Sequence, residues 1–253
     1  MTDLRSPEPR RISAISAALA VLTAITCAPS AATTNVLRPK SASVVTTLVA
    51  AVPPKCKIGD VVTKLRGKDG RYAVLDTYHR LPSGWKPARL TWVNKTQQLQ
   101  LPAASAWRKL RLAAASAGIT INIVSAYRSG GYQETVFNRN VKKHGRAHAL
   151  KYVARPGHSE HQLALTVDIG LGAGVALRSE PVAGKPATKA ERAANWLHNN
   201  AATYGWVRSY PKGGLAATCY APEPWHWRFI GVEEAAKFTA SKLTLREYLW
   251  RKR

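Results

Sequence analysis

Two short segments of the chain contain the residue types that bind metal ions and move protons. The first, residues 155–168, contains two histidines and an aspartate, and the second, residues 223–226, reads Glu-Pro-Trp-His. Imidazole nitrogen and carboxylate oxygen are common zinc ligands, and a catalytic zinc site needs three protein ligands and a position left for water. The set that we expect to bind zinc is His161, Asp168 and His226.

Spacing alone leaves other interpretations of these residues open. Seven histidines in 253 residues will form some chance pairs, and His158 with His161 is one such pair, so His158 is a rival ligand. In an interpretation without metal, Asp168 caps a turn and His226 is hydrogen-bonded in the core.

Glu223 is the candidate general base. It precedes a proline, which favours an extended backbone, so its side chain should project from the loop that leads into the next strand. Close to His226 but not bound to the metal, its carboxylate could take a proton from zinc-bound water and return it to the leaving amine. Zinc lowers the pKa of such water toward about 7, which makes hydroxide available at neutral pH.

The elements around these residues must bring them to one place. Seven positions separate His161 from Asp168, which would put them on opposite faces of an unbroken strand. We therefore expect a turn near Gln162 before a strand over 163–169. In a strand over 225–230, the same alternation should turn His226 and Arg228 toward the site and Trp225, Trp227 and Phe229 toward the core.

The rest of the chain predicts helices mixed with short strands. Alanine-rich sequence between a proline and a glycine predicts a helix over 102–117, and a β-branched run predicts a strand over 119–124. Without a regular βαβ alternation, the predicted fold is α+β with a small, mostly antiparallel sheet flanked by helices. We further expect helices over 132–144 and 191–204, a short strand over 72–75, and turns at 67–70 and 81–84.

The start of the chain is typical of an exported protein. Residues 1–11 are polar with three arginines, residues 12–28 carry no charge and small residues follow, which predicts a signal peptide over 1–32. A retained N-terminal anchor is the alternative. Residues 33–60 are rich in Ser, Thr, Ala and Pro and are interpreted as a linker or arm, so the catalytic domain is expected over 61–253. We expect a monomer, extracytoplasmic and without a membrane span after cleavage.

Cysteine usage agrees with export. Cys27 lies inside the predicted signal, which leaves Cys56 and Cys219 to form one disulfide. Two free thiols, or a lipid on Cys27, are the alternatives.

Charge restricts the partners. The chain has 38 Lys and Arg against 14 Asp and Glu, a net charge of +24, which predicts attraction to a polyanion. The basic residues are spread along the chain and no nucleic-acid motif is evident, so we expect anionic cell-envelope polymers and not nucleic acid as partners. A hydrophobic fraction of 45% excludes a mostly disordered chain.

Several motifs match one known family in their order along the chain. They are Asp76–Pro82, Ser125–Ser129 with Gln133, Gly157–Gln162 continuing to Asp168-Ile169, Tyr204-Gly205-Trp206, Tyr210-Pro211 and Glu223–Arg228. Over about residues 70–250 the sequence resembles the VanY-type zinc D-alanyl-D-alanine carboxypeptidases, bacterial cell-wall peptidases whose wider group includes the hedgehog signalling domain. The resemblance implies a hedgehog/D-Ala-D-Ala peptidase-like fold.

The resemblance also implies roles for individual residues. The zinc ligands and the base, Glu223, are the same as those expected above. Arg128 would meet either the terminal carboxylate of the substrate or the developing oxyanion, and its planar, permanently charged guanidinium suits both. Gln133 and Ser159 would add polar contacts to the substrate. The alternative role of Arg128 is a surface salt bridge. For Gln133 and Ser159 the alternative is an ordinary hydrogen bond in a turn or on a helix surface.

The function implied is an exported zinc metallopeptidase that removes the C-terminal D-alanine from peptidoglycan stem peptides. Whether it is a D,D- or an L,D-carboxypeptidase stays open. An endopeptidase of the same fold and a catalytically silent cell-wall binding protein are the alternatives. The sequence departs from the family pattern at Ala164, where glycine is expected, at Thr166 and at Trp227, none of which is a ligand or the base.

Overall fold

The computed structural model describes residues 52–172 and 174–252. The predicted signal peptide, Cys27 and most of the predicted arm lie outside the described residues. The described residues belong to one compact unit. Within the described ranges, no helix combines the length and the apolar character that crossing a membrane requires.

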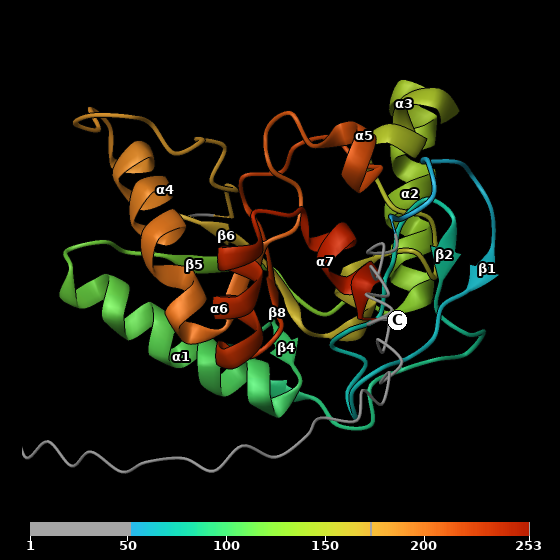
Figure 1. Cartoon of the computed structure of the whole chain (residues 1–253), viewed down its shortest axis with the longest axis horizontal. Helices are drawn as coiled ribbons and strands as arrows, with labels where there is room; N and C mark the ends of the chain where they lie inside the picture. Colours follow the sequence, from blue (N-terminus) through green and yellow to red (C-terminus); the bar gives the residue numbers. More distant parts are fainter. Residues whose placement is uncertain (1–51, 173, 253) are drawn as a thin grey trace, which may run out of the picture. The chain divides into compact units, whose positions relative to one another are not determined.

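The described chain forms helices around a four-stranded sheet (Figure 1). Sheet neighbours follow the order β5-β6-β8-β7 and all pair antiparallel. This confirms the predicted α+β class with a small antiparallel sheet. The helices are α1 (Leu101–Ser116), α2 (Gly130–His144), α3 (Arg146–Tyr152), α4 (Lys189–Asn200), α5 (Leu215–Thr218), α6 (Val232–Ser241) and α7 (Leu245–Arg251), with 3₁₀ turns η1 (Glu160–Leu163) and η2 (Ala201–Tyr204). The sheet strands are β5 (Asn122–Ser125), β6 (Thr166–Gly170), β7 (Trp206–Arg208) and β8 (His226–Phe229).

Two further pairs of short strands lie outside this sheet. β1 (Val61–Val62) pairs parallel with β2 (His79–Arg80), and β3 (Thr91–Trp92) pairs antiparallel with β4 (Gln98–Leu99). The short strand expected over 72–75 is not formed. Instead, the backbone carbonyls of Arg71 and Ala73 accept hydrogen bonds from the buried Arg228 side chain. This side chain takes the place of the neighbouring strand that would otherwise bond these carbonyls.

The sheet has one apolar face and one polar face. Val167 and Trp227 belong to the main hydrophobic cluster together with Trp107 of α1 and Leu197 of α4. Because side chains alternate along a strand, the residues between them point to the opposite face. α1 and α4 therefore cover the apolar face, and Asp168 is carried on the polar face.

Helix and strand ends follow local hydrogen bonding. α2 begins two residues earlier than expected because the Ser129 side chain accepts a hydrogen bond from the backbone N–H of Tyr132, which caps the helix. The 191–204 prediction divides into α4, which starts at a Thr188–Glu191 capping box, and the 3₁₀ turn η2. The turns expected at 67–70 and 81–84 are both present.

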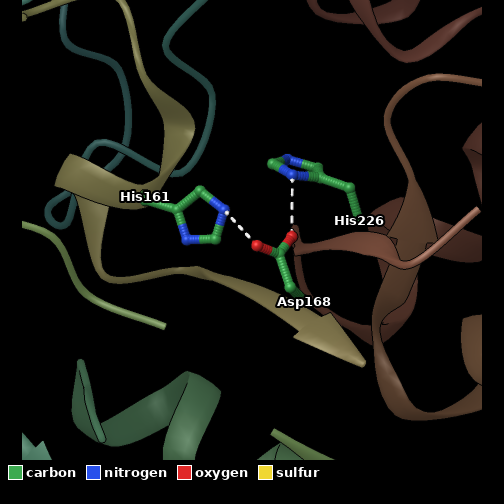
Figure 2. A group of neighbouring side chains, drawn as sticks. All are labelled: His161, Asp168 and His226. Carbon is green, nitrogen blue, oxygen red and sulfur yellow. Dashed lines mark ion pairs between the residues drawn. The ribbon is translucent and has the colours of Figure 1, made fainter. Parts of the chain in front are cut away.

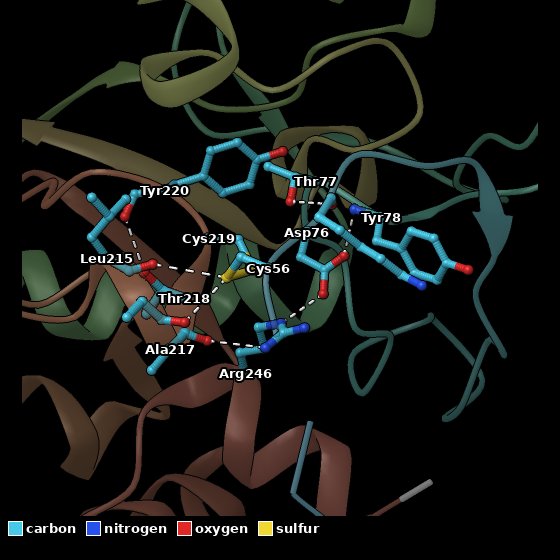
Figure 3. The surroundings of a disulfide bond; sticks show 12 residues. Cys56, Asp76, Thr77, Tyr78, Leu215, Ala217, Thr218, Cys219, Tyr220 and Arg246 are labelled. Atoms are coloured by element: carbon cyan, nitrogen blue, oxygen red, sulfur yellow. Dashed lines mark hydrogen bonds and ion pairs between the residues drawn. A yellow bond between two sulfur atoms is a disulfide. The ribbon is translucent and has the colours of Figure 1, made fainter. Parts of the chain in front are cut away.

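The predicted disulfide between Cys56 and Cys219 is present, with the two Cα atoms 5.3 Å apart (Figure 3). It lies beside a buried ionic cluster in which Asp76 bonds the side chains of His79 and Arg246. Burial alone would raise the pKa of Asp76, but His79 and Arg246 hold it well below its usual range. The disulfide anchors the loop that precedes β8 to the N-terminal end of the described chain.

Residues 52–60 are the described end of the predicted arm. They form no helix or strand, but Gly59 donates its backbone N–H to Thr77 and Asp60 pairs with Arg155 at 3.0 Å. With the disulfide at Cys56, these contacts fasten residues 56–60 to the catalytic part of the chain. The domain boundary after residue 60 stays a prediction.

Candidate metal centre and catalytic pocket

Adjacent strands place two of the predicted ligands opposite each other. Asp168 of β6 and His226 of β8 are register partners, so their side chains leave the same face of the sheet with Cβ atoms about 5 Å apart. His161 reaches the same point from η1, the turn expected near Gln162 (Figure 2). The turn ends at Ala164, whose φ of 53° is left-handed, a conformation that glycine adopts without strain.

The geometry of the three side chains suits a cation. His161 Nε2 lies 3.3 Å from Asp168 Oδ2, and His226 Nδ1 lies 3.3 Å from Asp168 Oδ1. One ligand atom from each residue lies within 4.8 Å of the other two. In the described part of the chain, His161 Nε2, Asp168 Oδ1 and His226 Nδ1 are buried and have no hydrogen-bond partner. Leaving three such atoms unsatisfied is costly, and one bound cation would satisfy all of them.

The opposite ring nitrogens are held by other groups. His161 Nδ1 lies 2.6 Å from the backbone oxygen of Ala126, and His226 Nε2 lies 2.9 Å from Glu160 Oε2. An acceptor at one nitrogen fixes the proton there and leaves the other nitrogen free for a metal, the arrangement typical of ligating histidines. Both rings are therefore oriented to present a lone pair to the same point.

The rival histidine lies elsewhere. His158 is fully buried, with Nδ1 2.7 Å from the backbone oxygen of Asp76 and Nε2 3.1 Å from Asp60 Oδ1. Both of its ring nitrogens have partners outside the metal group. It belongs to the contacts that hold residues 56–60 in place.

Glu160 is a site residue that the sequence analysis missed. Its carboxylate is 5% exposed and lies within 2.9 Å of His226 Nε2 and 2.6 Å of both Ser209 Oγ and Arg228 Nη1. Burial alone would raise the pKa of Glu160, but Arg228, His226 and Ser209 together lower it to about 2, so the group is ionised. A carboxylate next to His161 was the available signal, but sequence did not show that it reaches His226.

Glu160→Gln is expected to weaken zinc binding by about 10- to 100-fold, the usual effect of losing a group that orients a metal ligand. The amide keeps the size of the side chain but removes the charge that holds His226 and leaves Arg228 without its carboxylate. Competition with a chromophoric chelator measures the affinity. Glu233→Gln, at an exposed carboxylate on α6, is the control. Unchanged affinity in a folded Glu160→Gln protein would show that this carboxylate does not orient the ligand.

Glu223 lies on the loop before β8, as expected. Its Oε2 is 3.2 Å from His226 Nδ1, beside the ligand atoms. Burial raises the pKa of Glu223, and contact with His226 only partly opposes this. A carboxyl group with a raised pKa is suited to accept a proton and then release it near neutral pH.

All seven predicted site residues line one pocket of about 200 Å³, the catalytic pocket. Arg128 Nη2 lies 3.8 Å from Asp168 Oδ2. Gln133 donates its Nε2 to the backbone oxygen of Ala154, and Ser159 Oγ accepts from the backbone N–H of His161. Arg128 thus sets a positive charge beside the metal group, while Gln133 and Ser159 also support the pocket wall.

The aromatic residues of the pocket differ from expectation. Trp225 was expected to face the core, but β8 begins only at His226, and Trp225 lies half-buried in the preceding turn as a wall of the pocket. Tyr210 and Tyr220 also line the pocket, and burial raises the pKa of both phenols, which keeps them neutral. Trp227 and Phe229 do pack in the core as predicted.

Comparison with known proteins gives a consistent set of relatives. Residues 96–232 match the model of the family described as VanY, D-alanyl-D-alanine carboxypeptidase. The bifunctional D-Ala-D-Ala dipeptidase and D-Ala-D-Ala carboxypeptidase VanXYC of Enterococcus gallinarum is 31% identical over 150 residues, which are 59% of this chain and 76% of that protein.

Two solved structures share the fold. One is a variant of the vancomycin-resistance D,D-pentapeptidase VanY in complex with Zn(II), with a TM-score of 0.59, 26% identity, and coverage of 71% of this chain and 98% of that one. The other is the LD-carboxypeptidase LdcB, with a TM-score of 0.60, 28% identity, and coverage of 75% and 94%. The similarity spans nearly the whole of both solved chains.

Proposed function

Because the chain belongs to the VanY family of D-alanyl-D-alanine carboxypeptidases, we propose that it is an exported zinc peptidase that removes the C-terminal D-alanine from peptidoglycan stem peptides. The observation that carries the proposal is the convergence of three buried ligand atoms, each without a hydrogen-bond partner in the described chain, on a pocket that also contains Glu223 and Arg128. A carboxylate base and a fixed cation beside a metal group suit amide hydrolysis.

His161, Asp168 and His226 would hold the metal. Two imidazoles and one carboxylate are a donor set that suits zinc, and a VanY relative is solved with Zn(II). When bound, zinc supplies a Lewis acid that makes water a usable nucleophile at neutral pH.

Glu223 and Arg128 would perform the remaining steps. Glu223 Oε2 takes a proton from the attacking water as its oxygen bonds to the carbonyl carbon of the scissile amide. The same carboxyl then gives the proton to the amide nitrogen as the C–N bond breaks, so that the amine leaves neutral. Arg128 holds negative charge on the substrate, on the terminal carboxylate or on the developing oxyanion.

The proposed location follows from substrate and sequence. Peptidoglycan is extracytoplasmic, and the predicted signal peptide at 1–32 would direct export. Removal of residues 1–32 takes away three arginines, Asp3 and Glu8, and the remaining net charge of about +23 would retain the enzyme at an anionic envelope. Such retention should weaken as salt is raised.

The test is mass spectrometry of defined pentapeptide and tetrapeptide muropeptides after incubation with the full zinc-loaded chain. Loss of one alanine from the pentapeptide would establish D,D-carboxypeptidase action, and loss from the tetrapeptide L,D-carboxypeptidase action. Both kinds of relative are known, so both substrates are needed. Internal fragments would assign an endopeptidase, and intact peptides with zinc bound would assign a binding protein.

A further inference from the structure

A groove adjoins the catalytic pocket. It has a volume of about 740 Å³ and is lined by the end of α2, by α3, and by the loops after β6, after β7 and before β8. Four residues line both cavities: Tyr152, Val153, Glu223 and Trp225. We call it the side groove. Because Glu223 lines both cavities, a substrate that is cut beside Glu223 lies next to the groove.

Size indicates that part of the substrate must lie outside the catalytic pocket. At about 200 Å³ the pocket is smaller than the roughly 300–1,000 Å³ of typical ligand sites. It can hold the end of a peptide, and the residues before the scissile bond need further space. Two other cavities, of about 410 and 650 Å³, share no lining residue with the catalytic pocket.

The side groove carries unbalanced positive charge. Arg178 and Lys212 line it, and neither forms an ion pair in residues 52–172 and 174–252. Its one carboxylate besides Glu223 is Glu180, which is already paired with Arg208 at 2.5 Å. The guanidinium of Arg178 lies 5.2 Å from the centre of the Trp225 ring, so this charge sits over the wall that the two cavities share.

Aromatic rings also line the groove. The ring of His148 stacks on the ring of Tyr152, with the ring centres 4.5 Å apart, and the ring centres of His148 and His144 lie 4.6 Å apart. His148 Nδ1 is also 3.2 Å from Asn140 Oδ1. The groove thus combines a ring surface for peptide backbone and apolar groups with two cations for a carboxylate.

We infer that the side groove binds an acidic segment of the peptide substrate, on the N-terminal side of the scissile bond, with a side-chain or α-carboxylate of that segment held by Arg178 and Lys212. This rests on the proposed function for the position of the scissile bond. Binding in the side groove makes the enzyme selective for peptides that carry a carboxylate on the N-terminal side of the scissile bond.

The test compares N-acetylated peptides that end either in D-alanyl-D-alanine or in a single D-alanine after an L-residue, and that carry either glutamate or glutamine at each of the three preceding positions. We expect the glutamate peptide to be favoured in kcat/KM at one position by about 3- to 10-fold, the effect of one or two partly exposed ion pairs. The double variant Arg178→Ala/Lys212→Ala should lose this preference. The matched control is Lys109→Ala/Arg111→Ala, which removes the same charge from the exposed side of α1 and should keep it.

Binding separates this inference from the proposed function. Calorimetric titration of the same peptides into zinc-loaded Glu223→Gln protein needs no turnover. Preferential binding of a glutamate peptide that disappears in the Arg178/Lys212 double variant would support the groove even if no peptide were hydrolysed. No preference at any position, a preference that the double variant retains, an equal loss in the α1 control, or no binding of any peptide would overturn it.

Discussion

Replacing Glu223 by glutamine is expected to lower kcat by about 100- to 10,000-fold, the range over which a positioned acid–base group contributes. Glutamine has the same size and can stay beside His226, but it can neither take a proton from water nor return one to the leaving amine. Because the unpartnered ligand atoms belong to other residues, zinc content should not change. KM should change little, since the substrate contacts stay in place.

The measurement is steady-state hydrolysis of the susceptible muropeptide together with zinc content by atomic emission. Glu233→Gln is the control, because Glu233 is an exposed carboxylate on α6 that lies outside the pocket. A loss of less than tenfold would mean that another group is the base. Loss of zinc in the variant would instead make Glu223 a ligand.

The second large effect is expected from His161→Ala, which should weaken zinc binding by more than about 100-fold, since losing a group that only orients a ligand already costs about 10- to 100-fold. Activity should fall with the metal. The variant removes one of the three converging ligand atoms, and the two that remain, from Asp168 and His226, are too few to hold zinc.

His158→Ala is the matched comparison, because it removes a buried histidine three positions away whose ring nitrogens face Asp76 and Asp60. It should lower stability but keep the zinc affinity. Thermal unfolding with and without added zinc checks both variants, since a ligand that binds only the folded state raises Tm. A zinc-dependent shift in His161→Ala that is absent in His158→Ala would exchange the roles of the two histidines.

Much of this arrangement could be predicted from local patterns. Alternation along 225–230 indicates that His226 and Arg228 share a face, and a seven-residue separation requires a turn between His161 and Asp168. These are properties of the backbone within a few residues, so the sequence contains them. Cysteine counting likewise predicted the Cys56–Cys219 bond, because a single pair allows only one intramolecular connection.

Other features depend on which segments become neighbours, and only the tertiary structure decided them. Alternation does not say that β6 pairs with β8 in the register that sets Asp168 against His226. From the sequence, Glu160 is an ordinary turn residue. Its partners in the fold, Ser209 and Arg228, lie 49 and 68 residues away along the chain. Trp225 became a pocket wall because the strand starts one residue later than its pattern implies.

The side groove is the clearest case of this second kind. Arg178, Lys212 and Trp225 come from separate loops, and no period or motif relates them in the sequence. The sequence by itself determined the reactive groups and the faces that carry them, because these depend on residue type and local backbone geometry. Tertiary structure determined which charges are compensated and which are free to meet a substrate, because compensation depends on distances between segments that only folding brings together.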